Sequence, residues 1–379
     1  MKALVIVSAL DVGGAELYVE RLVGALKDQC EFTVALPNAP NMIEFGQRLR
    51  SHARVVSDAF DRFNALPSLA IKLRSLARQH DVIHLNSNHP CSRLGIAFAF
   101  ALARVRPTVC VEQRVTPVGD ISVPRGLEPV LPVLFRWSRR SVARLIAVSR
   151  ENADLLTTLY KIPRGKISVV HNGSDFQELD EAQARLRRQS LRAELGLRPD
   201  QPIVLVLARI APNKGHRFLV DAAHAILDQH PNAHFVFAGA LDDAQRLMAQ
   251  VDALGLKSAF SLLGFRTDTQ EMLAAADVFV LPSLAEGFSL SIVEALAAGL
   301  PVIATRVGGA SEAIEHGRNG FLVPPADSAA LAQALLHALS MSESERMLIS
   351  SAARKSAAQF STAAMAAKTF AVYRQVVRK

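Results

Sequence analysis

Two glutamates separated by seven residues lie in the stretch PSLAEGFSLSIVEALAAGLPV, residues 282–302. Residues 289–298 have almost no polar face, which is typical of a short helix that is buried on all sides. Glu294 nevertheless falls in the middle of this segment, and Glu286 precedes Gly287, which marks the expected helix start. An ionised carboxylate removed from water destabilises the fold unless another group pairs with it. We therefore expect Glu294 to have a specific partner.

Two basic residues follow the apolar run IVLVLA, where a strand is expected to end. Arg209 comes directly after this run, and Lys214 comes five residues later, just before Gly215. Two cations at a strand-to-helix turn, with a glycine that permits close backbone approach, predict a receptor for a phosphate or diphosphate. The alternative is two surface charges near a turn. The helix start at Gly287 would add free N–H groups and the positive end of a helix dipole to the same site.

The two glutamates suit a sugar that is attached to such a diphosphate. A carboxylate accepts two hydrogen bonds at once, so Glu294 could hold the vicinal hydroxyls of a ribose or hexose. Glu286, in the loop, would contact a sugar closer to the phosphates. The alternative for Glu294 is an internal ion pair with a basic residue. The acidic pair Asp242 and Asp243 is interpreted as the cap of a helix rather than as a metal site.

Short apolar runs alternate with helix-length segments along the whole chain. They are ALVIV, FTVAL, ARVV, DVIHL, TVCVE, RLIAV and KISVV in the first half, and IVLVLA, HFVFAG, AFSLLG, DVFVLP, PVIAT and GFLVP after a polar stretch at 175–200. This alternation predicts an α/β fold with two Rossmann-like, doubly wound parallel-sheet domains. Ligands of such sheets bind at the carboxyl ends of the strands, and here we expect them in a cleft that the two domains face.

The expected domains are residues 1–185 and 186–358, followed by a C-terminal helix at 359–379. The helix has apolar residues that indicate docking, either back onto the first domain or as the last helix of the second. In the first domain, glycines and polar residues follow the expected strands and predict an acceptor or phosphate site. These residues are Gly13, Gly14, His84, Asn86 and Asn88. The alternative for His84 is a core histidine.

Composition and charge exclude several classes of protein. Half of the 379 residues are hydrophobic and 21% are charged, so disorder is excluded. The three cysteines show no metal-like spacing and favour a reduced, cytoplasmic location, and the amino end does not resemble a cleaved signal. The run LGIAFAFALA is far shorter than the ~20 residues that cross a bilayer. The net charge is +8, but the chain contains no nucleic-acid-binding motif, so nucleic acid is not expected as a partner.

A basic amphipathic segment offers a second use for the positive charge. In PRGLEPVLPVLFRWSRRSVARL, a helical projection places apolar residues on one side, namely Leu127, Val130, Leu131, Leu134 and Trp137. Basic residues fall opposite, namely Arg125, Arg136, Arg139 and Arg140. Such a helix can lie on an anionic membrane surface, and the inner face of the membrane is therefore an alternative location. A packing helix with a solvated basic face is the other interpretation.

Residues 209–322 resemble the retaining glycosyltransferases of family 4 (glycosyl transferases group 1), which have the GT-B architecture. The matching pieces are ARIAPNKG, the stretch 262–327 with its two glutamates, and, in the first domain, GGAE and HNGSD. The resemblance implies transfer of a sugar from a nucleoside-diphosphate sugar, UDP-sugar being favoured, with retention of configuration and without a metal or other cofactor. The acceptor would be a glycan or lipid-linked molecule in bacterial cell-surface polysaccharide or lipopolysaccharide synthesis.

The resemblance also implies roles for individual residues of the second domain. Glu286, Arg209 and Lys214 would be the catalytic groups. Binding of the donor would involve Arg209, Lys214, Glu286, Gly287, Phe288, Ser289, Leu290 and Glu294, with the ribose held by Glu294. The family commonly has a histidine near the reacting sugar, where this chain has Gln113 or Arg114. A non-catalytic sugar-nucleotide-binding subunit and a sugar-nucleotide epimerase on the same fold are the alternatives.

Overall fold

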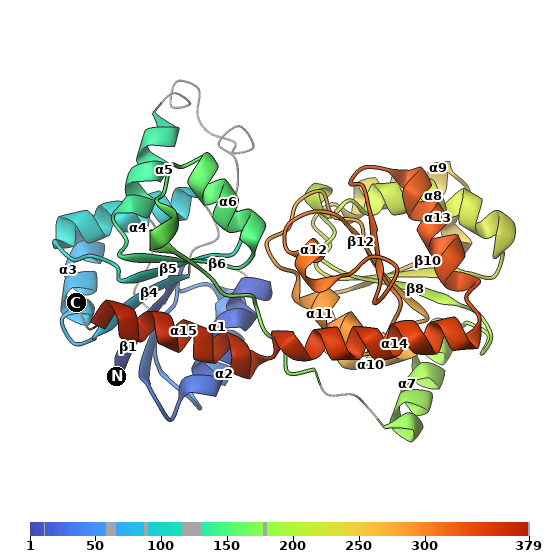
Figure 1. Ribbon diagram of the computed structural model, residues 1–379, viewed down its shortest axis with the longest axis horizontal. Helices are drawn as coiled ribbons and strands as arrows, with labels where there is room; N and C mark the ends of the chain where they lie inside the picture. Colours follow the sequence, from blue (N-terminus) through green and yellow to red (C-terminus); the bar gives the residue numbers. More distant parts are fainter. Residues whose placement is uncertain (11, 58–65, 87–89, 116–129, 177–179, 378–379) are drawn as a thin grey trace. The chain divides into compact units, whose positions relative to one another are not determined.

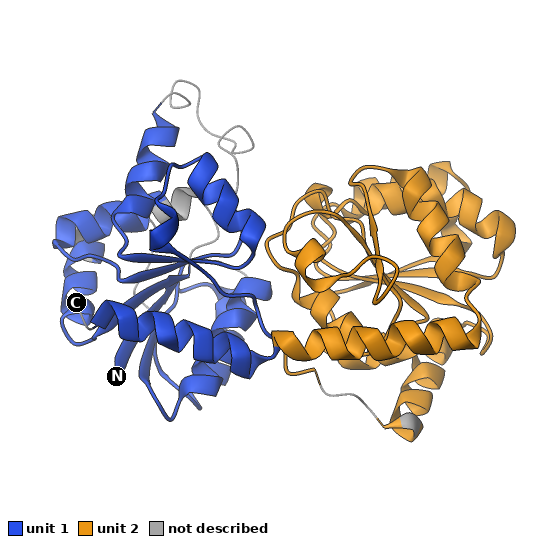
Figure 2. Ribbon diagram, viewed as in Figure 1, with its two compact units in different colours: residues 1–173, 361–379 blue, residues 174–360 orange. Residues whose placement is uncertain are grey.

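The computed structural model describes residues 1–379 except 11, 58–65, 87–89, 116–129, 177–179 and 378–379. The chain forms two compact units (Figure 2). Unit 1 comprises Met1–Gly173 together with Ser361–Lys379, and unit 2 comprises Ser174–Phe360. The division therefore lies earlier in the chain than the boundary predicted at 185, and the last helix is part of unit 1.

Unit 1 is built on a seven-stranded parallel sheet with the order β3-β2-β1-β4-β5-β6-β7 (Figure 1). The strands are β1 (Lys2–Val7), β2 (Glu31–Ala35), β3 (Arg54–Val56), β4 (Val82–Asn86), β5 (Val109–Glu112), β6 (Arg144–Ala147) and β7 (Ile167–Val169). The helices are α1 (Gly14–Leu26), α2 (Ile43–Leu49), α3 (Leu66–Ala77), α4 (Pro90–Ala103), α5 (Leu131–Arg140), α6 (Arg150–Thr158) and α15 (Thr362–Val377).

Unit 2 contains a six-stranded parallel sheet with the order β10-β9-β8-β11-β12-β13. The strands are β8 (Ile203–Leu207), β9 (His234–Ala238), β10 (Phe260–Gly264), β11 (Val278–Leu281), β12 (Val302–Thr305) and β13 (Phe321–Val323). The helices are α7 (Glu181–Glu194), α8 (His216–Gln229), α9 (Ala244–Ala253), α10 (Thr269–Ala275), α11 (Leu290–Ala297), α12 (Ala310–Ala313), α13 (Ser328–Leu339) and α14 (Glu343–Ala357). Two parallel sheets, each covered by helices, confirm the predicted fold class.

The central strands are buried throughout because both faces of each sheet are covered. Every residue of β8, β9 and β11 is buried, as is every residue of β4 and β5 in unit 1. A strand with one face in water would instead alternate between apolar and polar residues. The continuous runs that predicted parallel strands therefore reflect burial on both sides.

The last helix, α15, packs within unit 1 against α1. The Tyr18 hydroxyl lies 3.5 Å from the Thr369 hydroxyl, and the Tyr373 hydroxyl lies 2.5 Å from Nδ1 of His84. Tyr18 and Tyr373 are among the largest fully buried side chains. Of the apolar positions that predicted docking, Val372 and Tyr373 are buried in the core of unit 1, whereas Val377 is exposed.

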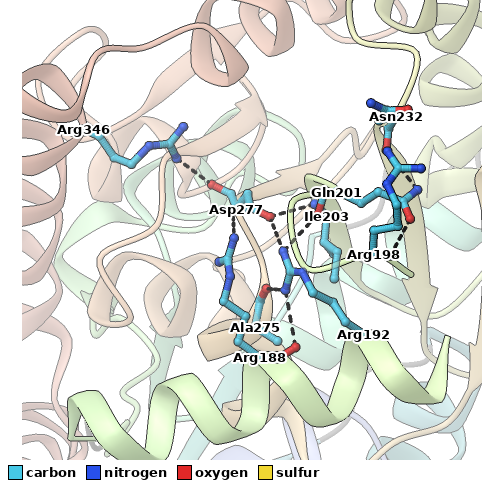
Figure 3. Close-up of polar contacts among 9 residues, drawn as sticks. All are labelled: Arg188, Arg192, Arg198, Gln201, Ile203, Asn232, Ala275, Asp277 and Arg346. Atoms are coloured by element: carbon cyan, nitrogen blue, oxygen red, sulfur yellow. Dashed lines mark hydrogen bonds and ion pairs between the residues drawn. The ribbon is translucent and has the colours of Figure 1, made fainter. Parts of the chain in front are cut away.

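A partly buried ion-pair cluster around Asp277 fixes α7 to the amino end of β11 (Figure 3). The Asp277 carboxylate pairs with Arg188 at 2.5 Å and Arg192 at 2.8 Å, and it accepts a hydrogen bond from the Ile203 backbone N–H at 2.8 Å. Arg346 donates to the Asp277 carbonyl oxygen at 3.0 Å. The cluster lies at the edge of the sheet opposite to the carboxyl ends of the strands, so its role is to hold the unit together.

The amphipathic segment forms α5, which begins at Leu131 with Pro132 in its first turn. The prediction that Arg139 belongs to a solvated basic face is wrong. Its guanidinium is buried, pairs with the Glu112 carboxylate at 3.1 Å and lies 4.0 Å from the Tyr160 ring centroid. A buried arginine is stabilised by such a carboxylate and ring. Arg125 and Leu127 lie outside the described residues, among which no helix combines the length and apolar character needed to span a bilayer.

Candidate functional site

An ion pair between Lys214 and Glu286 lies where two neighbouring strands of unit 2 end. Lys214 ends the short helical turn after β8, and Glu286 lies in the loop after β11. The Lys214 ammonium is 2.5 Å from Oε1 of Glu286, and the Ser283 hydroxyl donates to the same oxygen at 2.6 Å. Their side chains are 21% and 11% exposed, respectively. The carboxylate predicted to touch a sugar is therefore already held by two partners.

Gly215 allows the turn that carries Lys214 to contact the chain after β11. Its φ is +69°, and a Cβ atom there would lie 2.0 Å from the Pro282 carbonyl oxygen. The Leu284 N–H also donates to the Asn213 carbonyl oxygen at 2.8 Å. Any other residue at Gly215 would clash with this backbone, so the glycine places the ammonium beside the carboxylate.

A second close approach, absent from the sequence-based site, involves the glycine pair after β12. The Gly309 N–H donates to the Gly287 carbonyl oxygen at 2.7 Å. A Cβ atom on Gly308, whose φ is +57°, would lie 2.5 Å from the Glu286 carbonyl oxygen. The two glycines thus fix the backbone of the loop that carries Glu286. Their position, separated by two residues from the run PVIAT, where a strand is expected to end, was the sequence signal for this contact.

The helix after this loop begins later than predicted. Its N-cap is Ser289 and its first residue is Leu290, whereas the helix start was expected at Gly287. Gly287 is instead held in the loop by Gly309, and Phe288 is buried with its ring centroid 5.0 Å from that of Phe360. The free N–H groups of the helix therefore belong to the first turn after Ser289, whose hydroxyl lies 2.9 Å from the Ser291 hydroxyl.

Glu294 is half-buried, which corrects the prediction of a helix buried on all sides. Five residues of α11 are buried, namely Leu290, Ile292, Val293, Ala295 and Leu296. Ser291 and Glu294, three residues apart, are more exposed and share one face. Oε1 of Glu294 accepts a hydrogen bond from the Ser174 hydroxyl at 3.0 Å. A carboxylate on this narrow polar strip keeps access to a ligand, and Ser174 is a site neighbour that sequence reasoning missed.

Arg209 has a different environment from Lys214. Its guanidinium is more than half exposed and lies 3.5 Å from the Asp242 carboxylate. Asp243 occupies the N-cap of α9, but its side chain makes no capping hydrogen bond. The prediction that these two carboxylates cap a helix is therefore wrong. The Asp243 side chain makes no capping hydrogen bond, and Asp242 is a counter-ion for Arg209.

His216 begins α8, directly after Gly215, and is buried. Its ring packs edge-on against Phe237, with the centroids 5.2 Å apart. Neither ring nitrogen has a hydrogen-bond partner among the described residues. Burial, and to a lesser extent the charge of Lys214, lowers the pKa of His216 to about 4. The ring is therefore neutral and adds no charge beside Lys214.

In unit 1, Gly13 and Gly14 begin α1, but His84 does not reach an open site. The Gly13 N–H donates to the Glu16 carboxylate at 3.0 Å. His84 is completely buried, bonded to Tyr373, and burial lowers its pKa to about 3. His84 is therefore a core histidine covered by α15, and the prediction that it binds the acceptor is wrong. Asn88 lies outside the described residues.

Asn86 and Gln113 end adjacent strands of unit 1 with unused hydrogen-bonding capacity. The Asn86 amide donates to the Ala15 carbonyl oxygen at 3.1 Å, and the Gln113 side-chain oxygen accepts from Asn172 at 3.0 Å. Oδ1 of Asn86 and Nε2 of Gln113 are buried without a partner within the described ranges. Arg114, the next residue, is half-buried. Buried polar atoms of this kind indicate a place for a polar ligand or water.

The carboxyl edge of the unit 2 sheet combines the groups that a sugar diphosphate requires. It offers an ammonium, a guanidinium and helix N–H groups for anionic oxygens, and two carboxylates for hydroxyls. The described part of the chain contains no group of three potential metal ligands.

Comparisons with curated proteins found relatives that transfer sugars. The chain is 27% identical over 382 residues to alpha-D-kanosaminyltransferase of Streptomyces kanamyceticus, covering 94% of this chain and 97% of that protein. It is 31% identical over 255 residues to the UDP-Gal:alpha-D-GlcNAc-diphosphoundecaprenol alpha-1,3-galactosyltransferase of Escherichia coli, covering 65% of this chain and 62% of that protein. The second match therefore spans less than two thirds of the relative.

Comparisons with solved structures show a shared fold over nearly the whole chain. The Anabaena protein HepE, crystallised in complex with UDP and glucose, has a TM-score of 0.83 at 24% identity, with 99% of this chain and 100% of that chain covered. Sucrose-phosphate synthase from Thermosynechococcus elongatus has a TM-score of 0.80 at 23% identity, with both chains covered completely.

Two family models match consecutive parts of the chain. The model described as Glycosyltransferase Family 4 matches residues 12–178, and the model described as Glycosyl transferases group 1 matches residues 187–355. The first match lies in unit 1 and the second in unit 2, and the second includes Lys214, Glu286 and Glu294. The chain therefore belongs to the family 4 glycosyltransferases, the glycosyl transferases of group 1.

Proposed function

We propose that the chain transfers a hexosyl or N-acetylhexosaminyl group from a nucleoside-diphosphate sugar, with UDP-sugar favoured, to a glycan or lipid-linked acceptor with retention of configuration. The observation that carries this proposal is the Lys214–Glu286 pair, which two glycine-dependent backbone contacts hold beside the first turn of α11. The Escherichia coli relative supports this choice of substrates, since it is a galactosyltransferase that uses UDP-Gal and a diphosphoundecaprenol-linked acceptor.

In the proposed donor complex, the diphosphate takes the Lys214 ammonium away from Glu286. Arg209 is exposed and can turn from Asp242 toward the same oxygens. Backbone N–H groups of residues 287–290 complete the anion site, with Phe288 and Leu290 shaping its apolar wall. The Glu286 carboxylate, released from Lys214, then accepts from the sugar hydroxyls, while Glu294 accepts from those of the ribose.

The same groups suit the chemical step. The bond between the anomeric carbon and the diphosphate breaks, the acceptor oxygen bonds to that carbon, and its proton leaves with the nucleotide product. Negative charge develops on the departing diphosphate, so preorganised cations and N–H groups lower the barrier. Protein cations at this position would serve the purpose that a metal ion serves in other transferases, and we propose a metal-independent reaction.

We propose that unit 1 binds the acceptor at the carboxyl ends of β4 and β5. The unpartnered Asn86 Oδ1 and Gln113 Nε2 support this assignment because they supply one acceptor and one donor for hydroxyl groups. Gly13 and Gly14, at the start of α1, would allow close approach on the same edge. A role in bacterial cell-surface polysaccharide or lipopolysaccharide synthesis follows from this acceptor class, and a cytoplasmic location stays a prediction.

Two measurements test the proposal. Thermal unfolding with UDP-, GDP- and ADP-sugars should show stabilisation by one nucleotide class, about 2.7 kcal/mol at 100 times the dissociation constant. Radiolabelled sugar from that donor should then appear in a glycan or lipid-linked product. Stabilisation without transfer to any acceptor would favour a non-catalytic subunit, and interconversion of the sugar nucleotide itself would favour an epimerase. No stabilisation by any sugar nucleotide would contradict the proposal.

A further inference from the structure

A strongly basic edge lies at the amino ends of β5, β6 and β7 in unit 1, away from the carboxyl edge described above. The connecting segments 104–106, 140–144 and 161–166 contain seven basic residues and no acidic residue. These residues, named here the basic edge, are Arg104, Arg106, Arg140, Arg144, Lys161, Arg164 and Lys166. The strands are neighbours in the sheet, so the three segments lie side by side.

Hydrogen bonds to carbonyl oxygens hold the basic edge together. Lys166 donates to the Arg140 carbonyl oxygen at 2.5 Å, Arg140 donates to that of Lys161 at 3.2 Å, and Arg144 donates to that of Gly165. Burial, and to a lesser extent the charges of Arg106 and Arg140, lowers the pKa of Lys166. Arg164 lies 3.9 Å from the Asp154 carboxylate, and both side chains are exposed.

Two members of the basic edge have a backbone conformation that L-residues rarely adopt. Arg104 has φ of +54° and Lys161 has φ of +50°, and Ala326 is the one other non-glycine residue with positive φ in the described ranges. Glycine or asparagine would adopt this conformation at a lower cost in folding free energy. The presence of long cationic side chains at both strained positions therefore indicates a function for their charge.

An exposed apolar strip adjoins the basic edge on α4 and α5. Phe98 and Leu102, four residues apart on α4, are 41% and 60% exposed, and Val133 and Trp137, four residues apart on α5, are 66% and 36% exposed. The Phe98 and Trp137 ring centroids are 5.2 Å apart, so the two pairs form one continuous strip. Leu102 lies just before Arg104 and Arg106, and Trp137 lies one turn before Arg140. The apolar strip is therefore continuous with the basic edge.

We propose that the apolar strip and the basic edge bind an anionic lipid surface, with the strip in the acyl boundary and the cations on the headgroups. A nucleic acid or soluble polyanion would match the cations but would leave four large apolar side chains in water. A lipid surface satisfies both features, because interfacial binding depends on buried apolar area and on attraction to anionic headgroups. The recognition does not depend on the proposed sugar transfer.

The test uses the single tryptophan of the chain, Trp137, as a reporter. The full chain is mixed with phosphatidylcholine vesicles containing about 30% phosphatidylglycerol, or with pure phosphatidylcholine vesicles, at low ionic strength. We expect co-sedimentation and a blue shift of the emission with the anionic vesicles alone. The variant R104N/R106Q/K161N should bind roughly 125-fold more weakly, because each basic residue near such a surface contributes about fivefold. Its melting temperature should not fall, because asparagine accepts the positive φ at two of the sites.

The matched control removes three positive charges from the other end of the same sheet. The exposed residues Lys27, Arg50 and Arg54 are replaced by glutamine, and this variant should bind the anionic vesicles within a few-fold of the unaltered chain. A second variant, L102S/V133S, should weaken the binding that persists at high salt. Absence of binding to anionic vesicles, binding without a change in Trp137 emission, or equal loss in the control variant would each overturn the proposal. Tight binding to RNA or heparin with no vesicle binding would show a polyanion partner instead.

Discussion

Replacing Lys214 by methionine removes the cation that we assign to the departing diphosphate while keeping most of the apolar stem. Loss of one preorganised donor to a developing anion costs about 2.7–4 kcal/mol, so kcat should fall by roughly 10²–10³. The Lys214 side chain is only 21% exposed and its ammonium is held 2.5 Å from Glu286, so the charge is poorly screened by water. Arg209 is 57% exposed, and the corresponding R209M change should therefore cost less.

The same change affects the folded chain without ligand. Glu286, 11% exposed, would retain Ser283 as its partner but lose its counter-ion. We expect a loss of about 2 kcal/mol in the free energy of unfolding, which corresponds to a melting temperature about 4–8 °C lower for a unit of this size. Adding E286Q to K214M should restore much of this stability, because a neutral amide needs no counter-ion, whereas it should not restore kcat.

Single-turnover transfer and thermal unfolding of K214M, E286Q and the double variant provide the test. The exposed Lys257, at the amino end of β10, supplies a control, since K257M makes the same change in charge and should alter neither quantity. A kcat for K214M within a few-fold of the unaltered chain would refute the phosphate assignment. Strictly additive effects of the two changes on stability would show that the ion pair is not coupled in solution.

Four further outcomes are expected. Transfer should survive EDTA, and a full loss restored by Mg²⁺ or Mn²⁺ would contradict the mechanism. E294Q should weaken sugar-nucleotide binding while leaving the melting temperature nearly unchanged; a large drop in stability with unaltered affinity would show a structural role. D277N should lower the free energy of unfolding by about 3 kcal/mol in a urea titration, since it deprives the buried Arg192, and the more exposed Arg188, of their counter-ion. In the folded chain the pKa values of His84 and His216 are lowered from 6.5 to about 3 and about 4, so the unfolded chain binds protons more readily. The free energy of unfolding should therefore decrease as the pH drops below 6.5, by up to about 2 kcal/mol for each histidine at pH 5. H216L should flatten this pH dependence.

The sequence alone determined the elements and their order. Continuous apolar runs separated by helix-length segments are produced by parallel strands that are covered on both faces, so both sheets could be predicted. The site loops could also be located, because Gly215 and Gly287 interrupt the pattern where strands end. The pairing of the two glutamates with a sugar diphosphate came from residue chemistry and the family resemblance, and the roles of those residues stay predictions.

Tertiary structure alone decided the partners and the burial of individual side chains. Ser174 meets Glu294 from a distant part of the chain, and Lys214 meets Glu286 because two glycines let separate loops touch. His84 looked like a residue at an open edge, but α15 returns from the end of the chain to cover it. Hydrophobic periodicity reports which face of an element is covered, whereas it does not report which distant segment covers it, and that segment sets each side chain's charge partner and its access to water.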